Sequence, residues 1–243
     1  MSRIDGRDLL ELRSMRIENN VQMHADGSVL IHLGNTQVLC AVSVENRVPR
    51  FLRGTGAGWI TSEYGMLPRS TTDRMDRDRT RSSGRTHEIQ RLIGRSLRAV
   101  ADLDILGERT FTVDCDVIQA DGGTRTASIT AGFIALHHAM QKLVTSGELT
   151  TIPLRTPVAA TSVGILDGEV FLDLCYEEDS RADVDLNVVK TTDGDYIEVQ
   201  GTAEGHPFPR KLMDKMLDAA DIGLEKLFSL QQSQMTNDIS EVK

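Results

Sequence analysis

Residues 119–128 combine the side chains and the chain geometry that bind an oxyanion. They read Gln-Ala-Asp-Gly-Gly-Thr-Arg-Thr-Ala-Ser. The alternating run 110–118 predicts a strand before them, and apolar residues at helical spacing over 129–144 predict a helix after them. The first amides of a helix lack carbonyl partners and carry a partial positive charge. A strand, a Gly-Gly turn and a helix start therefore predict an anion site.

Four residues of this turn have separate tasks in such a site. Gly122 and Gly123 allow the backbone to approach an anion closely. Thr124 can donate a hydroxyl, and Arg125 can donate two hydrogen bonds to one phosphate. The alternative is an ordinary glycine-rich turn before a core helix. The arginine favours the anion site, because at a helix start only the anion is expected to hold it.

Residues 177–185 contain five carboxylates and one arginine, a composition that suits either a divalent-cation site or a solvated hairpin. Mg²⁺ takes a few oxygen ligands and keeps several waters. On one straight strand Asp179 and Asp185 would lie about 20 Å apart, at ~3.3 Å per residue. The chain between them must therefore turn before both can bind one ion. The alternation that follows predicts that Asp185 and Asn187 share a face. Spacing alone favours the solvated hairpin over the cation site.

Positive charge is concentrated in residues 47–98. This segment has twelve arginines, no lysines and five acidic residues, a net charge of +7, which leaves −16 for the remainder of a chain whose net charge is −9. Because guanidinium groups bind phosphate in pairs of hydrogen bonds, the segment predicts a localised surface for phosphate or nucleic acid. The alternative is pairing with acidic residues across a subunit interface. The candidates for either role are Arg50, Arg53, Arg69, Arg74, Arg77, Arg91, Arg95 and Arg98.

The last three of these arginines lie on a predicted helix over 87–103. Its apolar stripe consists of Ile89, Leu92, Ile93, Leu97 and Val100. Arg91, Arg95 and Arg98 fall on the opposite face. That face is expected to bind RNA, to contact another subunit or to be solvated.

The remaining pattern predicts an α+β domain. Three hairpins are expected, over 28–33 and 36–46, over 158–166 and 169–176, and over 184–190 and 196–202. An amphipathic helix follows over 212–228. Hairpins followed by a helix occur twice, which indicates internal pseudo-repetition. We expect one domain over 1–228 and a polar tail over 229–243.

The composition limits the class of protein. A chain of 243 residues with 40% hydrophobic content can bury a full core. No apolar run approaches the roughly 20 residues of a membrane span, and the first residues lack the apolar core of a secretion signal. Cys40, Cys115 and Cys175 lie in apolar runs and are expected to be reduced core thiols. The six histidines show no metal-ligand spacing. A cytoplasmic protein is therefore expected.

Eight sequence blocks follow one another along the chain and together resemble the bacterial ribonuclease PH family. The resemblance extends over about residues 5–228, and only His87, Pro209 and the two tails depart from the family pattern. The blocks are Phe51-Leu-Arg-Gly, Gly58-Trp-Ile-Thr-Ser-Glu-Tyr, Met66-Leu-Pro-Arg-Ser-Thr, Gly84-Arg-Thr-His-Glu-Ile-Gln-Arg-Leu-Ile-Gly-Arg, residues 119–128, Tyr176-Glu-Glu-Asp-Ser, Val184-Asp-Leu-Asn-Val and Glu198-Val-Gln-Gly-Thr-Ala-Glu-Gly.

The resemblance implies a fold, an activity and partners. The fold would be the ribosomal-protein-S5-domain-2-like duplicated βαβ arrangement, assembled as a homohexamer, a trimer of dimers. The activity would be that of a tRNA nucleotidyltransferase, a phosphorolytic 3′-to-5′ exoribonuclease that trims precursor tRNA and other RNA 3′ ends. Inorganic phosphate would be the co-substrate, and nucleoside diphosphates would be released reversibly. Mg²⁺ or Mn²⁺ would be the cofactor.

The resemblance also assigns roles to residues of this chain. The family's phosphate-binding residues fall on Arg85, Gly123, Thr124 and Arg125. Its catalytic, metal-associated aspartates fall on Asp179 and Asp185, and which of them donates a proton stays open. Its hexamer-forming arginines correspond to Arg69, Arg74 and Arg77.

Three alternative functions are considered beside this one. A catalytically silent ring subunit would bind RNA only, and the joint presence of Arg85, Arg125, Asp179 and Asp185 argues against it. A hydrolytic metal nuclease would use water and release monophosphates, with no need of an oxyanion site. An RNA chaperone would use the basic segment alone and would shorten no RNA.

Overall fold

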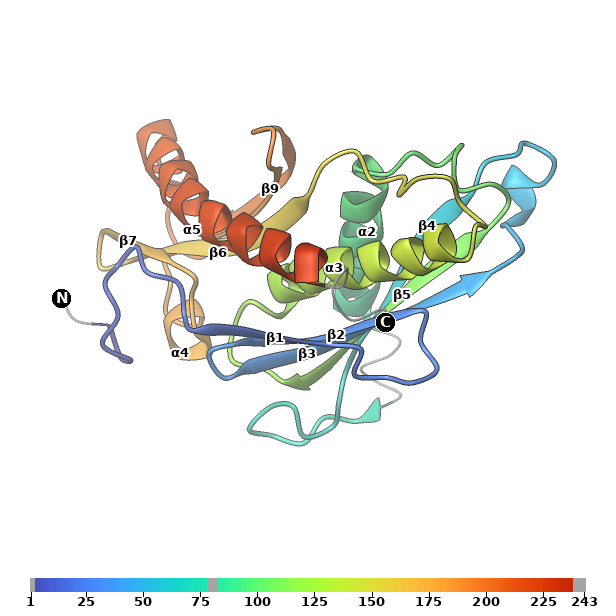
Figure 1. The fold of residues 1–243 in the computed structure, drawn as a ribbon. Helices are drawn as coiled ribbons and strands as arrows, with labels where there is room; N and C mark the ends of the chain where they lie inside the picture. Colours follow the sequence, from blue (N-terminus) through green and yellow to red (C-terminus); the bar gives the residue numbers. More distant parts are fainter. Residues whose placement is uncertain (1–2, 78–82, 238–243) are drawn as a thin grey trace.

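The computed structural model describes residues 3–77 and 83–237 of the chain. These residues form two β-sheets with helices packed between and over them (Figure 1). In chain order the elements are β1 (Met15–Asn19), β2 (Gly27–Leu33), β3 (Thr36–Glu45), the 3₁₀-helix η1 (Arg50–Leu52), β4 (Trp59–Met66), α2 (Gly84–Ala99), β5 (Thr110–Gln119), α3 (Thr124–Thr145), β6 (Val158–Leu166), β7 (Glu169–Leu172), α4 (Tyr176–Asp179), β8 (Val184–Thr191), β9 (Tyr196–Ala203) and α5 (Arg210–Asn237).

The first sheet has the strand order β1-β2-β3-β5-β4. Its strands pair antiparallel, except that β4 runs parallel to β5 and is joined to it through α2. The predicted hairpin of β2 and β3 is confirmed, with Leu33 opposite Thr36 and Gly34 at a φ of 55° in the turn. The predicted strand over 110–118 is confirmed as β5, which leads directly into the loop before α3.

The second sheet has the order β7-β6-β8-β9 and is antiparallel throughout. The predicted hairpins β6–β7 and β8–β9 are confirmed. However, the strand predicted over 169–176 ends at Leu172. Asp173 takes a φ of 55°, which takes the chain out of the strand, and Tyr176 begins the short helix α4.

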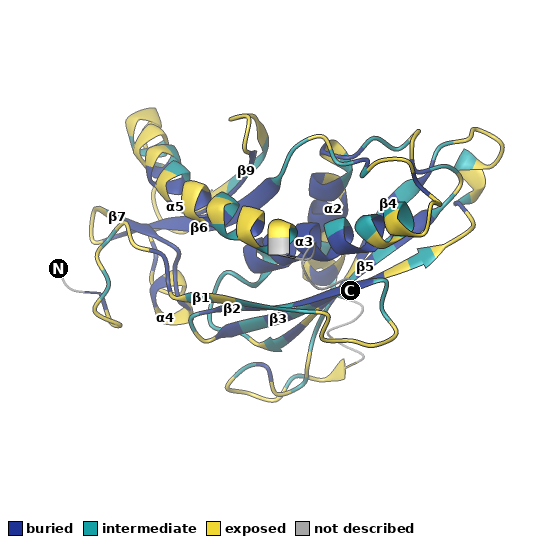
Figure 2. Cartoon of the chain, in the orientation of Figure 1, coloured by how far each residue is buried: buried dark blue, intermediate teal, exposed yellow. Residues whose placement is uncertain are grey.

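Helix α3 lies at the centre of the molecule and contacts both sheets. It packs on β2 and β3 of the first sheet and on β6 of the second. Most of its length is buried, as the dark blue ribbon in Figure 2 shows. Helix α2 covers β4, and α5 covers β6, β7 and β8. One apolar cluster accordingly fills the space between the first sheet, α2 and α3, and a second lies under α5.

Two helices differ in extent from their predictions. Helix α2 begins at Gly84, because the Ser83 hydroxyl accepts a hydrogen bond from Thr86 N at 3.1 Å, and it ends at Ala99 instead of continuing to 103. Helix α5 continues to Asn237, beyond residue 228, where the polar tail was expected to begin. Gln231 explains the extension: it is fully buried, and its amide donates to the carbonyls of α3 and β6 at 3.0 and 2.8 Å.

The structure is therefore an α+β fold with mixed sheets, as predicted from the sequence. All three cysteines are buried and unpaired, in agreement with the expectation of core thiols. None of the helices in the described ranges combines the length and the apolar composition needed to cross a bilayer.

Candidate active site

The turn between β5 and α3 has the backbone geometry of an anion-binding loop. We call residues 120–123 the oxyanion loop. Gly122 and Gly123 have φ values of 76° and 65°, a left-handed conformation that favours glycine. A Cβ on Gly122 would lie 2.3 Å from the carbonyl oxygen of Leu174, so this position also needs glycine for space. No side chain of the described residues caps the amino end of α3, so none of them occupies its first amides.

Thr124, the first residue of α3, is held by a tyrosine from the first sheet. The Tyr64 hydroxyl lies 2.8 Å from Thr124 Oγ1, and the tyrosine is 4% exposed. Burial raises the pKa of Tyr64, while the hydrogen bond with Thr124 and the positive charges of Arg85 and Arg125 oppose the rise. The charges of both arginines therefore act on the same hydroxyl, although the arginines belong to different helices.

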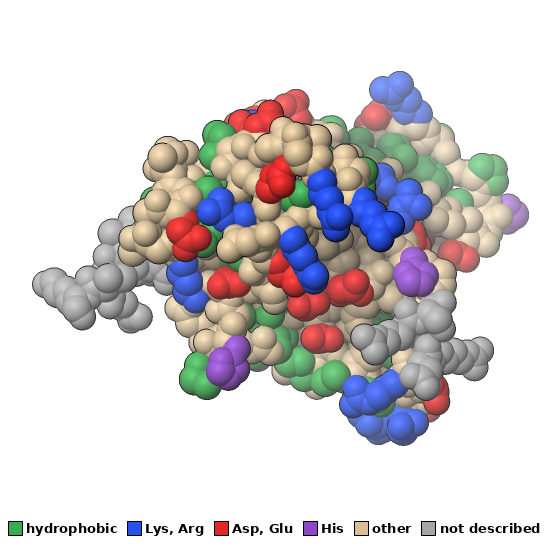
Figure 3. Space-filling view, turned by 90° about the vertical axis from the view of Figure 1, so that its right-hand side faces the viewer, with side chains coloured by type: hydrophobic (Ala, Val, Ile, Leu, Met, Phe, Trp, Pro, Cys, Tyr) green, Lys and Arg blue, Asp and Glu red, His purple; other side chains and the backbone are tan. Residues whose placement is uncertain are grey.

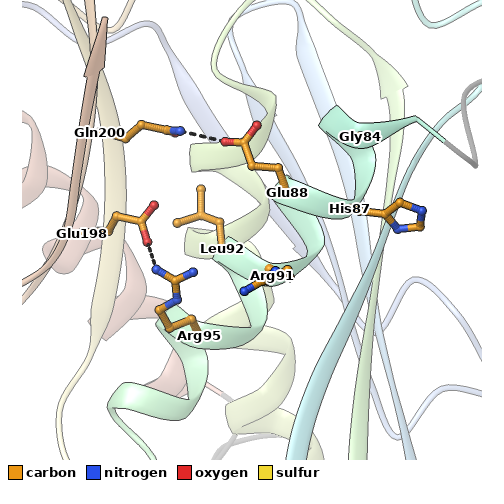
Figure 4. A pocket seen from close by; sticks show the side chains of 8 residues that line it. All are labelled: Gly84, His87, Glu88, Arg91, Leu92, Arg95, Glu198 and Gln200. Carbon is orange, nitrogen blue, oxygen red and sulfur yellow. Dashed lines mark hydrogen bonds and ion pairs between the residues drawn. The ribbon is translucent and has the colours of Figure 1, made fainter.

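Arg125 is held by side chains of the protein. Its Nη1 donates to Gln200 Oε1 at 2.9 Å and lies 3.4 Å from Glu88 Oε1. The Gln200 amide donates to the same Glu88 oxygen at 2.7 Å, as the dashed line in Figure 4 shows. The expectation that only an anion would hold Arg125 is therefore wrong. Its guanidinium is oriented in advance from β9 and α2.

Arg85 occupies the first turn of α2 and is exposed. Unlike Arg125, it has no ion-pair partner among residues 3–77 and 83–237. Within the described part of the chain, protein side chains therefore hold Arg125 but form no ion pair with Arg85.

The two candidate catalytic aspartates come from consecutive elements joined by a turn. Asp179 is the last residue of α4, and Asp185 lies in β8. The turn that the spacing required is present over 180–183. Partial burial and then the charge of Asp185 raise the pKa of Asp179, and the charges of Arg85 and Arg125 oppose that rise. The charges of Asp185 and of both arginines therefore act on Asp179.

The register of the second sheet explains why Asp185 faces this site. Asp185 pairs with Thr202, and Asn187 pairs with Gln200, so all four side chains lie on one face of β8 and β9. On that face, Gln200 accepts a hydrogen bond from Arg125. The neighbouring residues Val184 and Leu186 point the other way, into the cluster under α5. The predicted alternation of β8 is confirmed.

A hollow of about 310 Å³ adjoins the arginine site, between α2 and β9. Glu88 and Gln200 border it on the side of Arg125, and Arg95 forms an ion pair with Glu198 across it at 2.8 Å (Figure 4). Its remaining lining comes from Gly84, His87, Arg91 and Leu92. Two of the predicted basic residues, Arg91 and Arg95, thus line one hollow beside the predicted anion site.

The other predicted arginines lie elsewhere. Arg98 is engaged within the chain, since it donates to the Ile60 carbonyl at 2.7 Å and lies 4.3 Å from the centre of the Trp59 ring. Arg50 and Arg53 line a separate hollow beside η1. Arg69, Arg74 and Arg77 lie in the loop after β4, and residues 78–82 of that loop lie outside the described ranges.

On the face shown in Figure 3, acidic side chains lie between groups of lysine and arginine side chains.

Three residues of the site were not among the sequence candidates: Tyr64, Glu88 and Gln200. They occurred only within the resembling blocks, and no local pattern assigned them a task. Each acts through a tertiary contact, which spacing along the chain does not reveal.

A metal ion in this site would depend mainly on the two aspartates. Among the described residues, no group of three or more His, Cys, Asp or Glu side chains could hold a metal. Two carboxylates still match what Mg²⁺ requires, because that ion is usually held by one or two carboxylates, waters and a substrate phosphate. The charge of Asp185 raises the pKa of Asp179, so the two carboxylates interact electrostatically.

Two family models match this chain. Residues 11–141 match the model for the 3′ exoribonuclease family, domain 1, and residues 156–223 match the model for domain 2 of the same family. The first match contains the oxyanion loop, Arg85 and Arg125. The second contains both aspartates and Gln200.

Solved structures with the same fold include rice Rrp46 and chains of archaeal exosomes. The rice (Oryza sativa) Rrp46 structure has a TM-score of 0.77 at 20% identity, covering 96% of this chain and 100% of Rrp46. A chain of an archaeal exosome core has a TM-score of 0.74 at 24% identity, covering 96% and 91%. A chain of the Archaeoglobus fulgidus exosome with RNA bound to the active site has a TM-score of 0.78 at 25% identity, covering 96% and 92%. The fold is the S5-like fold of these proteins.

Proposed function

The chain belongs to the 3′ exoribonuclease family, and we propose that it is a phosphorolytic 3′-to-5′ exoribonuclease that trims the 3′ ends of precursor tRNA. One observation carries the proposal. The charges of Arg85, Arg125 and Asp185 all shift the pKa of Asp179, and Arg125 stands at the start of α3, directly after the oxyanion loop, where Gln200 accepts its hydrogen bond. Such a site can bring a free anion next to an RNA phosphate.

Inorganic phosphate is the nucleophile in this proposal. Arg85, Thr124, Arg125 and the first amides of α3 hold it. One of its oxygens bonds to the phosphorus of the last linkage, and the bond from that phosphorus to the 3′ oxygen of the preceding nucleotide breaks. A nucleoside diphosphate leaves, and the shortened RNA ends in a free 3′ hydroxyl. Because both reactants are anions, the arginines contribute mainly by removing repulsion and fixing the line of attack.

The two aspartates act on the leaving side of the linkage. A divalent cation, Mg²⁺ or Mn²⁺, would be held by Asp179 and Asp185 and would supply positive charge to the phosphate group. The leaving oxygen takes up a proton, which one of the two carboxylates can supply when it is protonated instead of bound to the cation. Exchange of an ester bond for a phosphoanhydride is readily reversible, so an excess of nucleoside diphosphate should extend RNA.

RNA is held mainly by its backbone in this proposal. Only 4% of the residues are aromatic, so stacking platforms are few, whereas arginines line the hollow beside the site. Weak sequence preference and a steep salt dependence follow. Arg50, Arg53, Arg69, Arg74, Arg77, Arg91 and Arg95 then contact RNA or a neighbouring subunit of a homohexamer. The three cysteines form no disulfide, which supports a cytoplasmic location in this proposal.

A nucleotide analysis tests the activity. A 3′-extended tRNA is incubated with Mg²⁺, with and without inorganic phosphate, and the released nucleotides are separated. Shortening that requires phosphate and yields nucleoside diphosphates is expected. Monophosphates released in phosphate-free buffer would identify a hydrolytic nuclease instead. Binding with no shortening under either condition would identify a silent subunit or an RNA chaperone.

A further inference from the structure

A buried arginine joins the oxyanion loop to the segment that carries α4. Arg13 precedes β1 and is 4% exposed. Its Nη1 donates to the carbonyl of Asp121, and its Nη2 lies 3.5 Å from the carbonyl of Gly122. Both of these carbonyls belong to the oxyanion loop. The same guanidinium is thus attached to the two residues that lead into Gly123 and α3.

The other side of this guanidinium binds Asp173, which is 1% exposed and lies just before α4. Arg13 Nε and Nη2 donate to the two carboxylate oxygens at 3.0 and 2.7 Å, and the Arg13 backbone amide donates to Oδ2 at 2.8 Å. Asp173 follows β7 at a φ of 55°, where the chain turns toward Tyr176. One planar group therefore spans from the loop to the start of the α4 segment.

A second arginine fixes α4 from the same N-terminal segment. Arg3 donates to both oxygens of Glu178, the neighbour of Asp179, at 2.8 and 2.6 Å. It also donates to the Leu172 and Asp173 carbonyls at 2.7 and 2.9 Å. Helix α4 is thereby held in place relative to Asp173. Movement of Asp173 relative to the loop would consequently carry Asp179 with it.

Burial of these charges is not explained by stability alone. A buried ion pair is often no more stabilising than apolar side chains of the same volume. An arginine also fixes the relative orientation of its hydrogen-bond acceptors, because the planar guanidinium holds several of them at fixed angles. Here the acceptors are two loop carbonyls and one carboxylate, which come from the two halves of the site.

We propose that Arg13 is a positioning residue that sets the oxyanion loop at the correct place relative to Asp179. The inference rests on the proposed function, in which the loop holds phosphate and Asp179 acts at the leaving oxygen. Arg13 itself touches no substrate. Within the described residues, its side chain donates hydrogen bonds to Asp121, Gly122 and Asp173.

Kinetics separate positioning from stability. A variant that is merely less stable has fewer folded molecules, which lowers the apparent kcat and leaves both KM values unchanged. A variant with a displaced loop binds phosphate less well in every folded molecule. A displacement of about 1 Å can lower the rate by up to about a hundredfold. RNA affinity, which depends on the other arginines, should stay the same.

Arg13→Lys tests this distinction, because lysine keeps the charge but cannot hold three acceptors in a plane. With folded protein quantified by circular dichroism, we expect the KM for phosphate to rise at least about tenfold, the kcat to fall, and the KM for RNA to change less than about twofold. Lys190→Met is the matched control. It removes the 2.6 Å ion pair of Lys190 with Asp221 between β8 and α5 and should leave the KM for phosphate unchanged.

Asp173→Asn provides a second variant, since asparagine keeps the shape and one acceptor but removes the charge. An unchanged KM for phosphate in folded Arg13→Lys and Asp173→Asn would overturn the positioning role. Failure of both variants to fold would overturn it too and would assign the pair to stability. The wild-type protein tests the activity separately. If it releases no nucleoside diphosphate in the presence of phosphate, the proposed function is wrong, whatever the Arg13 variants show.

Discussion

Tyr64 and Thr124 meet through their hydroxyl groups at 2.8 Å, which ties β4 to the first residue of α3. The contact lies beside the oxyanion loop and orients the Thr124 hydroxyl, the donor predicted from the sequence. The tyrosine ring is buried, so the hydroxyl can be removed with little change in packing.

Tyr64→Phe should weaken phosphate binding modestly. Loss of one neutral hydrogen bond costs about 1 kcal/mol, which corresponds to an approximately fivefold rise in the KM for phosphate. Steady-state kinetics at varied phosphate measure it. Tyr196→Phe, in the half-exposed ring of β9, is the control and should show no such rise. An unchanged KM in Tyr64→Phe would mean that Thr124 does not contact phosphate.

Arg125→Ala should abolish phosphate-dependent turnover while leaving much of the RNA affinity. Removing one donor from an oxyanion site typically lowers kcat by about a hundredfold to a thousandfold. Diphosphate release and RNA gel-shift titrations are measured on the same preparation. Equal loss of turnover and RNA binding would show that Arg125 is an RNA contact and not a phosphate ligand.

Gln200→Leu should give a milder form of the same defect. Without the Gln200 amide, Arg125 loses its 2.9 Å acceptor and is drawn toward Glu88. Hydrogen bonds to charged groups contribute about 1.5–3 kcal/mol, so the KM for phosphate should rise at least about tenfold. Glu198→Gln, two residues earlier in β9, removes the Arg95 ion pair and should leave that KM unchanged. Equal effects of both variants would contradict the assignment.

Gly122→Ala should impair the site through a collision. The added Cβ would lie 2.3 Å from the Leu174 carbonyl and force the loop away from the α4 segment. Gly168→Ala is a matched control, because Gly168 also has a positive φ, 83° against 76°, but no atom within 4 Å of the new Cβ. Both variants should lose about 1–2 kcal/mol of stability to backbone strain. Only Gly122→Ala should also lose phosphate affinity in phosphate titrations followed by thermal shift.

Asp114→Asn should stabilise the fold at neutral pH. Burial, and then the charges of Asp116 and Glu63, raise the pKa of Asp114. A carboxyl with a raised pKa in the folded state costs stability above that pKa, and the cost disappears below the unfolded value of about 3.9. Urea unfolding should therefore show a higher midpoint for the variant at pH 7 and a shrinking difference toward pH 4. Asp193→Asn, in the exposed β8–β9 turn, should show no gain. A pH-independent gain would contradict the electrostatic cause.

The local patterns of the sequence predicted much of this fold. The alternation of β5 and the glycines after it located the oxyanion loop and the start of α3, because both depend on neighbours in the chain. The six-residue spacing of Asp179 and Asp185 required a turn, which the structure contains. The assignment of these residues to catalysis stays a prediction, as does the organisation as one domain.

The contacts that orient the site could not be predicted from local patterns. Arg13 and Asp173 are 160 residues apart, and Arg125 and Gln200 are 75 residues apart. Such pairs depend on how two sheets meet, which spacing does not encode. The same reason explains the misjudged end of α5, since Gln231 is polar in the sequence but reaches buried carbonyls of α3 and β6.

Helix α3 contributes its amino end to the site and its body to both sheets. Tilting it would move the anion-binding amides and, through the shared packing, the strand that bears Asp185. Side chains at the middle of the helix, such as Phe133, can consequently affect the reaction rate. In this molecule an overpacked centre should impair turnover before it unfolds the chain.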